Sequence, residues 1–246
     1  MPSRTEKLSP KRRVGRPRKQ AQAVPGEDLR EQIVAAAAEL FRTRGIAQVS
    51  MQEIAQSVGL GTSSLYYWFR RKELIVAELV QRVNRLPIEH ARTLSRAQVP
   101  ADAQLFALVR FDVLLICDFP LEISEVHRFS ERDPDAFATY WQERAELVRA
   151  FARIVKSGSK AGLFRQVNAE LCAQTIIAQD ESVQNWRRTS FAGPVRSAAE
   201  LSVSAEAVAE HIASQTVGGL LVDNTQIERI KRRAAALGSQ LTAASA

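Results

Sequence analysis

Hydrogen-bonding side chains gather on a short stretch of this sequence, between Gly61 and Phe69. Hydroxyl and phenol groups occur there at helical spacing, while Leu65 and Phe69 fall on the opposite side of the same turn and can anchor it inward. Donor and acceptor groups on an exposed helix are suited to the edges of base pairs in a DNA groove. The residues concerned are Thr62, Ser63, Tyr66 and Tyr67.

Two preceding helices must position this surface. The first is predicted from Asp28 to Gly45, with Leu29, Ile33, Ala36, Ala37, Leu40 and Phe41 on one face. The second is predicted to begin at Ser50, because Glu53 three residues later completes a capping box, and to end at Gly59. Two short helices joined by a glycine-containing turn predict a helix-turn-helix, whose second helix enters the major groove. The alternative is an ordinary helical corner in which Tyr66, Tyr67 and Trp68 simply pack.

These residues resemble the DNA-binding signature of the TetR family of bacterial transcription regulators. The resemblance covers about residues 28–79 and includes Ile33 to Phe41, Gly45, Ile54-Ala55, Val58-Gly59-Leu60, Leu65 to Phe69 and Lys72-Glu73-Leu74. It implies DNA contacts at Ser50, Gln52, Thr62, Ser63, Tyr66, Tyr67 and Lys72, with Lys72 placed for a phosphate. This chain departs from the family pattern at Gly61, Ser63 and Trp68, so the resemblance does not identify an operator sequence.

The net charge of +7 is concentrated at the N-terminus. Residues 1–19 hold eight basic side chains and one acidic one, so this segment carries the whole excess. We expect residues 1–24 to form a disordered basic arm, since they lack apolar periodicity and contain several prolines. The stretch from Val14 to Lys19 resembles an AT-hook, in which Arg16 and Arg18 would enter a narrow minor groove. The alternative is a solvated tail that adds only nonspecific phosphate contacts.

Helical patterns continue to the C-terminal region, which predicts an all-α protein with three segments. These are the arm, a helix-turn-helix domain at 25–72, and a larger helical ligand-binding and dimerisation domain at 73–246. We expect Pro87 to disturb the fourth helix and a helix beginning near Asp102 to be buried, because it is apolar almost all round. No run is long enough for a membrane span, and two cysteines without metal-ligand spacing fit a cytoplasmic protein.

Two later helices, at about 169–188 and 204–222, are candidates for a dimer interface. Each carries a stripe of small and apolar residues that would permit close helix approach: Leu171, Thr175, Ala178, Val208, Ile212, Thr216 and Gly219. The resemblance implies that this pair forms a four-helix bundle across a two-fold axis. The same stripe could equally be intramolecular core.

A small, largely apolar effector is predicted to bind between the helices of the larger domain. Candidate lining residues are Phe106, Phe111, Asp112, Leu115, His127, Phe129, Phe137, Tyr140 and Trp141. The carboxylate of Asp112 projects from a mostly apolar helix, where it could meet a polar group of the ligand. More commonly such an acid finds an arginine or a backbone donor.

The sequence lacks the motifs of an enzyme. Its three histidines show no metal-ligand spacing, and the glycines near Gly59 follow a helix pattern rather than a strand. We therefore expect no enzymatic activity and no cofactor. The resemblance implies a homodimeric repressor that binds a palindromic operator in double-stranded DNA and is released by its effector. The alternative is an architectural, ligand-independent DNA-binding dimer.

Overall fold

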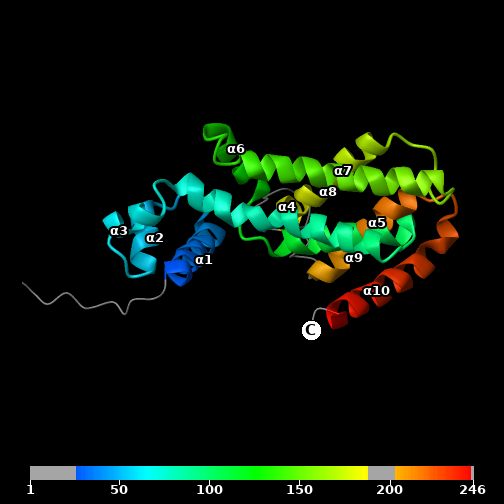
Figure 1. Cartoon of the computed structure of the whole chain (residues 1–246), viewed down its shortest axis with the longest axis horizontal. Helices are drawn as coiled ribbons and strands as arrows, with labels where there is room; N and C mark the ends of the chain where they lie inside the picture. The colour runs from blue at the N-terminus through cyan, green and yellow to red at the C-terminus, as the bar shows by residue number, and fades with distance from the viewer. Residues whose placement is uncertain (1–25, 188–202, 245–246) are drawn as a thin grey trace, which may run out of the picture.

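The structure is a computed structural model that describes residues 26–187 and 203–244, and within them every regular element is helical. The predicted all-α class is confirmed for this part of the chain. Three helices form one end of an elongated molecule, and α4 leads from them into a helical body, with α10 at the far end (Figure 1). The helices are α1 (Gly26–Arg44), α2 (Met51–Ser57), α3 (Thr62–Trp68), α4 (Lys72–Arg96), α5 (Ala101–Asp118), α6 (Ile123–Arg132), α7 (Ala138–Lys160), α8 (Ala169–Arg187), α9 (Ala205–Leu220), the short η1 (Asn224–Gln226) and α10 (Ile227–Ala244).

The small end domain folds as its glycines and apolar residues predict. Gly45 and Gly59 have φ angles of +78° and +71°, the left-handed conformation that lets a helix stop and the chain turn at once. Ile33, Phe41 and Ile54 are buried together with Leu65 of α3 and with Phe69, which caps the C-terminal end of α3. The two anchors predicted on the third helix are therefore confirmed, and they hold its opposite face toward solvent.

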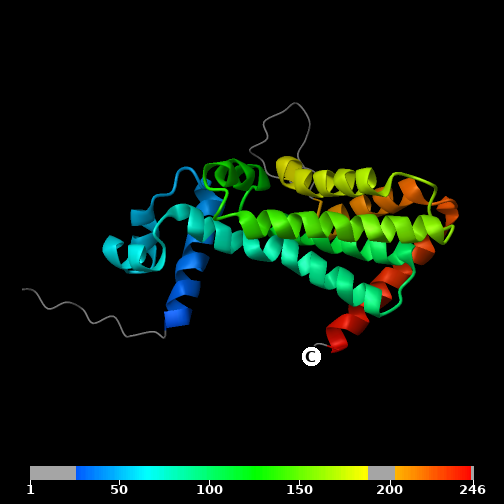
Figure 2. The ribbon, with the colours of Figure 1, turned by 45° about the horizontal axis from the view of Figure 1, so that its top comes forward.

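Helix α5 forms the centre of the body. It packs against α4, α7, α8, α9 and α10, and every residue of the helix except Asp118 is buried or half-buried. This confirms the buried helix expected from its nearly uniform apolar sequence. Figure 2 shows α7 and α4 running along the body while α8 and α9 cover it on another side. No helix among the described residues is long and apolar enough to cross a membrane.

Three expectations need correction. Helix α4 continues through Pro87 to Arg96, because the packing of a buried 25-residue helix outweighs the one backbone hydrogen bond that proline removes. Helix α1 begins at Gly26, so Asp28 lies within it rather than at its start. Helix α10 was not predicted, although Ile227, Ile230, Ala234 and Leu237 recur at helical spacing and pack on the core.

Candidate nucleic-acid interface and effector cavity

The outer face of α3 consists of exposed hydrogen-bonding side chains. Tyr67 is 83% exposed and Tyr66 is 47% exposed, and Thr62 and Ser63 at the start of the helix are also exposed. Trp68 is half-buried against the core, with its ring 5.6 Å from that of Tyr67 in an edge-on arrangement. Of the three aromatic residues Tyr66, Tyr67 and Trp68, only Trp68 therefore packs against the core as the helical-corner alternative expected. The two tyrosines are free to meet another molecule.

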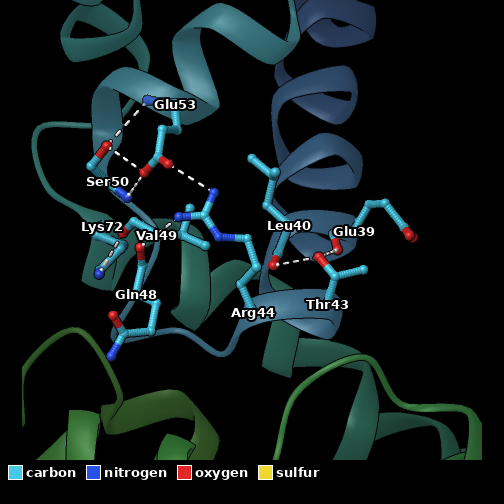
Figure 3. Close-up of polar contacts among 9 residues, drawn as sticks. All are labelled: Glu39, Leu40, Thr43, Arg44, Gln48, Val49, Ser50, Glu53 and Lys72. Atoms are coloured by element: carbon cyan, nitrogen blue, oxygen red, sulfur yellow. Dashed lines mark hydrogen bonds and ion pairs between the residues drawn. The ribbon is translucent and has the colours of Figure 1, made fainter.

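A capping box at Ser50 fixes the start of α2 (Figure 3). The Ser50 hydroxyl donates to Glu53 Oε2 at 2.7 Å and accepts from the Glu53 backbone N–H at 3.3 Å. Glu53 also accepts from the Ser50 N–H at 2.8 Å and pairs with Arg44 at 2.8 Å. These interactions, those with Ser50 first, lower the pKa of Glu53 to about 2. The predicted capping box is confirmed, and it leaves Ser50 and its neighbour Gln52 exposed.

Lys72 has an unexpected position at the start of α4. Its ammonium group donates to the carbonyl oxygens of Ile46 and Val49, both at 2.7 Å, and Figure 3 shows it directed to the loop that joins α1 to α2. It also lies 5.5 Å from the centre of the Phe129 ring, and burial lowers its pKa. Two of its three N–H groups are thus already used within the chain. The expected phosphate contact could use only the third.

Helix α6 is attached to the same loop from the other side. Glu125 of α6 accepts a hydrogen bond from the Ile46 N–H at 3.1 Å, and Asp133, which ends α6, pairs with Arg71 at 2.6 Å. Phe129 lies between the cationic groups of Lys72 and Arg132. Sequence reasoning missed this connection, because Glu125 is 79 residues from Ile46 and no local pattern joins them. The helix-turn-helix end domain is therefore held by α6 as well as by α4.

A small, partly enclosed cavity of about 10 Å³ lies in the body between α4, α5, α7 and α8. A space of that size holds about one water molecule. It is lined by Val83, Asn84, Asp112, Ile116, Ile123, Tyr140, Leu147, Ile177 and Glu181. Of the nine residues predicted to line an effector pocket, only Asp112 and Tyr140 lie here.

The other seven predicted pocket residues are distributed through the body. Phe106 belongs to the core around α5, while Phe129 and Phe137 belong to the cluster that includes the DNA-binding domain. The ring of Phe111 stacks on His90 with 4.4 Å between centres. Leu115 is half-buried, and Trp141 is partly exposed. The Nε2 atom of His127 lies 3.0 Å from the Tyr140 hydroxyl.

Asp112 faces a second buried carboxyl group, that of Asp180 on α8. No hydrogen bond from an arginine or a backbone donor to Asp112 occurs among the described residues, although the charge of Arg144 acts on it. Burial is the largest cause that raises the pKa of Asp112 to about 7. Burial, and after it the neighbouring Asp112, raises the pKa of Asp180 well above its usual value. Glu181 next along α8 is instead paired with Arg144 through two hydrogen bonds of 2.8 and 3.1 Å.

The two candidate dimer helices differ in what they expose. On α8 the predicted stripe lies outside, with Leu171 at 63% exposure and Thr175 and Ala178 exposed beside it. On α9 the predicted residues Val208 and Ile212 are buried against the core around α5. The intramolecular alternative is thus correct for those two residues. The α8 face has no partner within the described residues.

Comparisons with known proteins agree with this arrangement. Residues 33–79 match the family model described as bacterial regulatory proteins, tetR family. Among solved structures, AmtR of Mycobacterium smegmatis is 28% identical, with 87% of this chain and 97% of that chain covered and a TM-score of 0.60. AibR in complex with isovaleryl coenzyme A and operator DNA is 23% identical over 78% of this chain and 97% of that one, with a TM-score of 0.59. A regulator from Saccharomonospora viridis in complex with choline is 20% identical over 80% and 100%, with a TM-score of 0.63.

Proposed function

We propose that this chain is a regulator of the TetR family, because residues 33–79 match the model of that family. We propose further that it is a repressor that binds a palindromic operator as a homodimer and is released by a small effector. The observation that carries the proposal is the outer face of α3. Its hydroxyl and phenol groups are exposed, while Leu65 and Phe69 fix the helix from behind. Such a helix can enter the major groove with its N-terminal residues against base edges.

The proposed dimer would pair the exposed face of α8 with its copy in a second chain. An exposed leucine with small neighbours buries apolar area on association and lets two helices approach closely. Two copies of α3 could then read successive major grooves if they stand about 34–36 Å apart. Closed two-fold pairing is the commonest form of protein oligomer.

Helix α6 is proposed to transmit effector binding to α3. It begins at Ile123, which lines the cavity, and it carries Glu125 and Phe129, which contact the loop after α1 and Lys72. An effector that enlarges the cavity would shift α6 and, with it, the DNA-binding domain. The separation of the two α3 helices would then no longer match the operator, so the population of DNA-bound dimer would fall.

The relatives support response to a ligand. AibR was solved with isovaleryl coenzyme A and operator DNA, and the Saccharomonospora protein with choline. We propose that this chain likewise has an effector and no catalytic activity, and that it acts in the cytoplasm because its operator is chromosomal DNA. The DNA-contacting residues we propose are Arg16, Arg18, Ser50, Gln52, Thr62, Ser63, Tyr66, Tyr67 and, through its remaining N–H, Lys72. Arg16 and Arg18 lie outside the described residues.

The test is selection of random duplex DNA by the purified protein at physiological salt, followed by sequencing. We expect one palindrome, and we expect Tyr67→Ala to bind it more weakly with an unchanged unfolding temperature, since that side chain is exposed. Thr43→Ala, a change at an exposed residue of α1 away from α3, is the control. Recovery of A·T-rich DNA without symmetry would instead favour the architectural alternative, in which the N-terminal arm dominates.

A further inference from the structure

The facing carboxyl groups of Asp112 and Asp180 are a buried polar pair in the body. Asp180 is 0% exposed, and neither of its oxygens meets an N–H or hydroxyl donor from the described residues. The group it faces, Asp112, is 2% exposed. Burying ionisable groups without hydrogen-bond donors destabilises the folded state. A cost of this kind is typical of a site that meets its partner only when a ligand binds.

The surroundings restrict the partner's chemistry. No group of three or more metal-ligating side chains occurs among the described residues, which disfavours a chelated metal ion. Glu181 is paired with Arg144, whose charge also acts on Asp112, whereas neither aspartate forms an ion pair with another described residue. A ligand that supplies a positive charge together with N–H donors would satisfy both carboxylates at once.

The cavity wall also limits the rest of the ligand. Beside Asp112 it presents the side chains of Asn84, Tyr140 and Glu181, the last of which is paired with Arg144, whereas its remaining surface is aliphatic. The aliphatic residues are Val83, Ile116, Ile123, Leu147 and Ile177. Because about 10 Å³ is open, the space accepts a head the size of a water molecule and must expand for anything attached to it.

We propose that this cavity binds an organic amine, with its ammonium head against Asp112, the lining carboxyl group that Asp180 faces, and an aliphatic tail among the surrounding apolar residues. The proposal rests on the proposed function, since this amine would be the effector of the same body. In the empty state the two carboxyl groups share a proton. The ammonium group replaces that proton, so each amine that binds releases about one proton to solvent.

The amine site is connected to α6 through α8. One turn after Asp180, the Gln184 side chain accepts a hydrogen bond from the Ile123 N–H at 2.9 Å. Its Nε2 donates to the carbonyl oxygens of Ile116 at 3.2 Å and Leu121 at 2.8 Å. Any displacement of α8 by a bound amine therefore moves the backbone at which α6 begins.

The pH dependence of binding follows from the groups around the pair. Asp112 faces Asp180 and Glu181 from α8 and Arg144 and Tyr140 from α7. Arg144 and Glu181 stay paired, and burial keeps Tyr140 neutral by raising its pKa. Ionisation of the aspartate pair therefore controls affinity, which should rise from pH 6 to pH 8. An alkylammonium keeps its charge to about pH 10.

The experiment is calorimetric titration of the full-length protein, without DNA, with butylammonium, hexylammonium, 1,5-pentanediammonium and choline. Butyrate and butanol serve as tail-matched probes without the positive charge. We expect at least one primary amine to bind, with about tenfold weaker affinity in Asp112→Asn and in Asp180→Asn, and with proton release when buffers of different ionisation enthalpy are compared. Asp102→Asn is the matched control, because Asp102 is equally buried on α5 but accepts from the Ala103 N–H at 2.8 Å.

Several results would overturn the amine site: no binding by any of the amines, equal binding of butyrate or butanol, or binding unchanged in both aspartate variants. Choline carries a positive charge but has no N–H donors. If choline bound as tightly as the primary amines, this would also contradict a site at which the ligand donates hydrogen bonds to the aspartate pair. Because the titration contains no DNA, its failure leaves operator selection unaffected. Failure of operator selection would likewise leave amine binding measurable.

Discussion

The side chain of Lys72 stabilises the fold, although its position in the sequence indicates a DNA contact. The resemblance to known regulators places it beside a phosphate, yet its ammonium group donates to two carbonyls of the loop after α1. That loop carries Ile46 and Val49, which are buried, and precedes the Ser50 cap of α2. The lysine thus helps to position the helix-turn-helix before any DNA is present.

Replacing Lys72 by methionine should destabilise the protein as well as weaken DNA binding. Methionine keeps the apolar stem but leaves two carbonyls without their donor, a loss of about 1–3 kcal/mol in the free energy of unfolding. Denaturant unfolding of the variant measures it. Arg70→Met, which removes a charge from an exposed neighbouring position, should leave stability unchanged. If the two variants were equally stable, the hydrogen bonds of Lys72 within the chain would not contribute to the free energy of unfolding.

The aspartate pair gives the protein a characteristic response to pH. Burial raises the pKa of Asp112 from 3.8 to about 7, so between these values the folded state holds a proton that the unfolded state has released. The contribution of Asp112 to the free energy of unfolding is therefore fully present below about pH 4. It decreases as the pH rises toward 7. Urea unfolding across this range should show a flatter profile for Asp112→Asn. If Asp112→Asn kept the wild-type pH dependence, this assignment would be contradicted. The control variant Asp102→Asn should show the wild-type pH dependence.

At the scale of elements, α6 has a larger structural role than its ten residues suggest. Its start is held by Gln184 of α8, and its first turn and its end contact the DNA-binding domain through Glu125 and Asp133. Each of these contacts joins residues far apart in the sequence. Coupling between the body and the end domain therefore depends on a few hydrogen bonds at the two ends of one short helix.

Gln184→Ala should loosen this connection. The substitution removes a buried side chain that satisfies one backbone N–H and at least two carbonyls, so we expect a loss of more than about 2 kcal/mol. Hydrogen exchange should increase most at Ile123 and the first turn of α6. Gln142→Ala at an exposed position of α7 is the control. Unchanged exchange at α6 would show that Gln184 does not hold it.

The sequence predicted most of the helices and the surface of α3, because both depend on local patterns. Leu65 and Phe69 are buried and Tyr67 is exposed as helical periodicity requires, and the Ser50 cap follows from two residues three apart. The effector residues were predicted poorly, since an aromatic side chain has the same pattern in a core as in a pocket. Asp180 was missed because only the packing of α8 on α5 places it opposite Asp112.

For the whole molecule, the exposed face of α8 leads to a test of assembly. Leu171→Glu places a charge on the proposed two-fold contact, where two copies would repel and lose apolar burial. We expect sedimentation to show a monomer and operator affinity to fall more than tenfold, because one α3 helix remains per complex. Gln142→Glu at an exposed site elsewhere is the control. A dimer that survives Leu171→Glu would move the interface away from this face.

The basic N-terminal arm supports a second whole-molecule prediction. Residues 1–19 carry the full net charge of +7, so the rest of the chain is neutral overall. Deleting them should reduce the dependence of operator binding on salt, since fewer counterions are released. Titrations at several salt concentrations measure the slope. A slope equal to that of the full chain would show that the arm stays clear of DNA.

The hydrophobic cluster behind α3 determines how this regulator can be re-engineered. It includes Phe69 of the DNA-binding domain together with Val80 of α4, Phe119, Phe129 of α6 and Tyr140 of α7. A hybrid made by transplanting residues 26–72 onto the body of another regulator would sever this shared core. A functional graft must carry α6 and the facing turns of α4, α5 and α7 with the DNA-binding domain, or must reproduce their packing in the recipient.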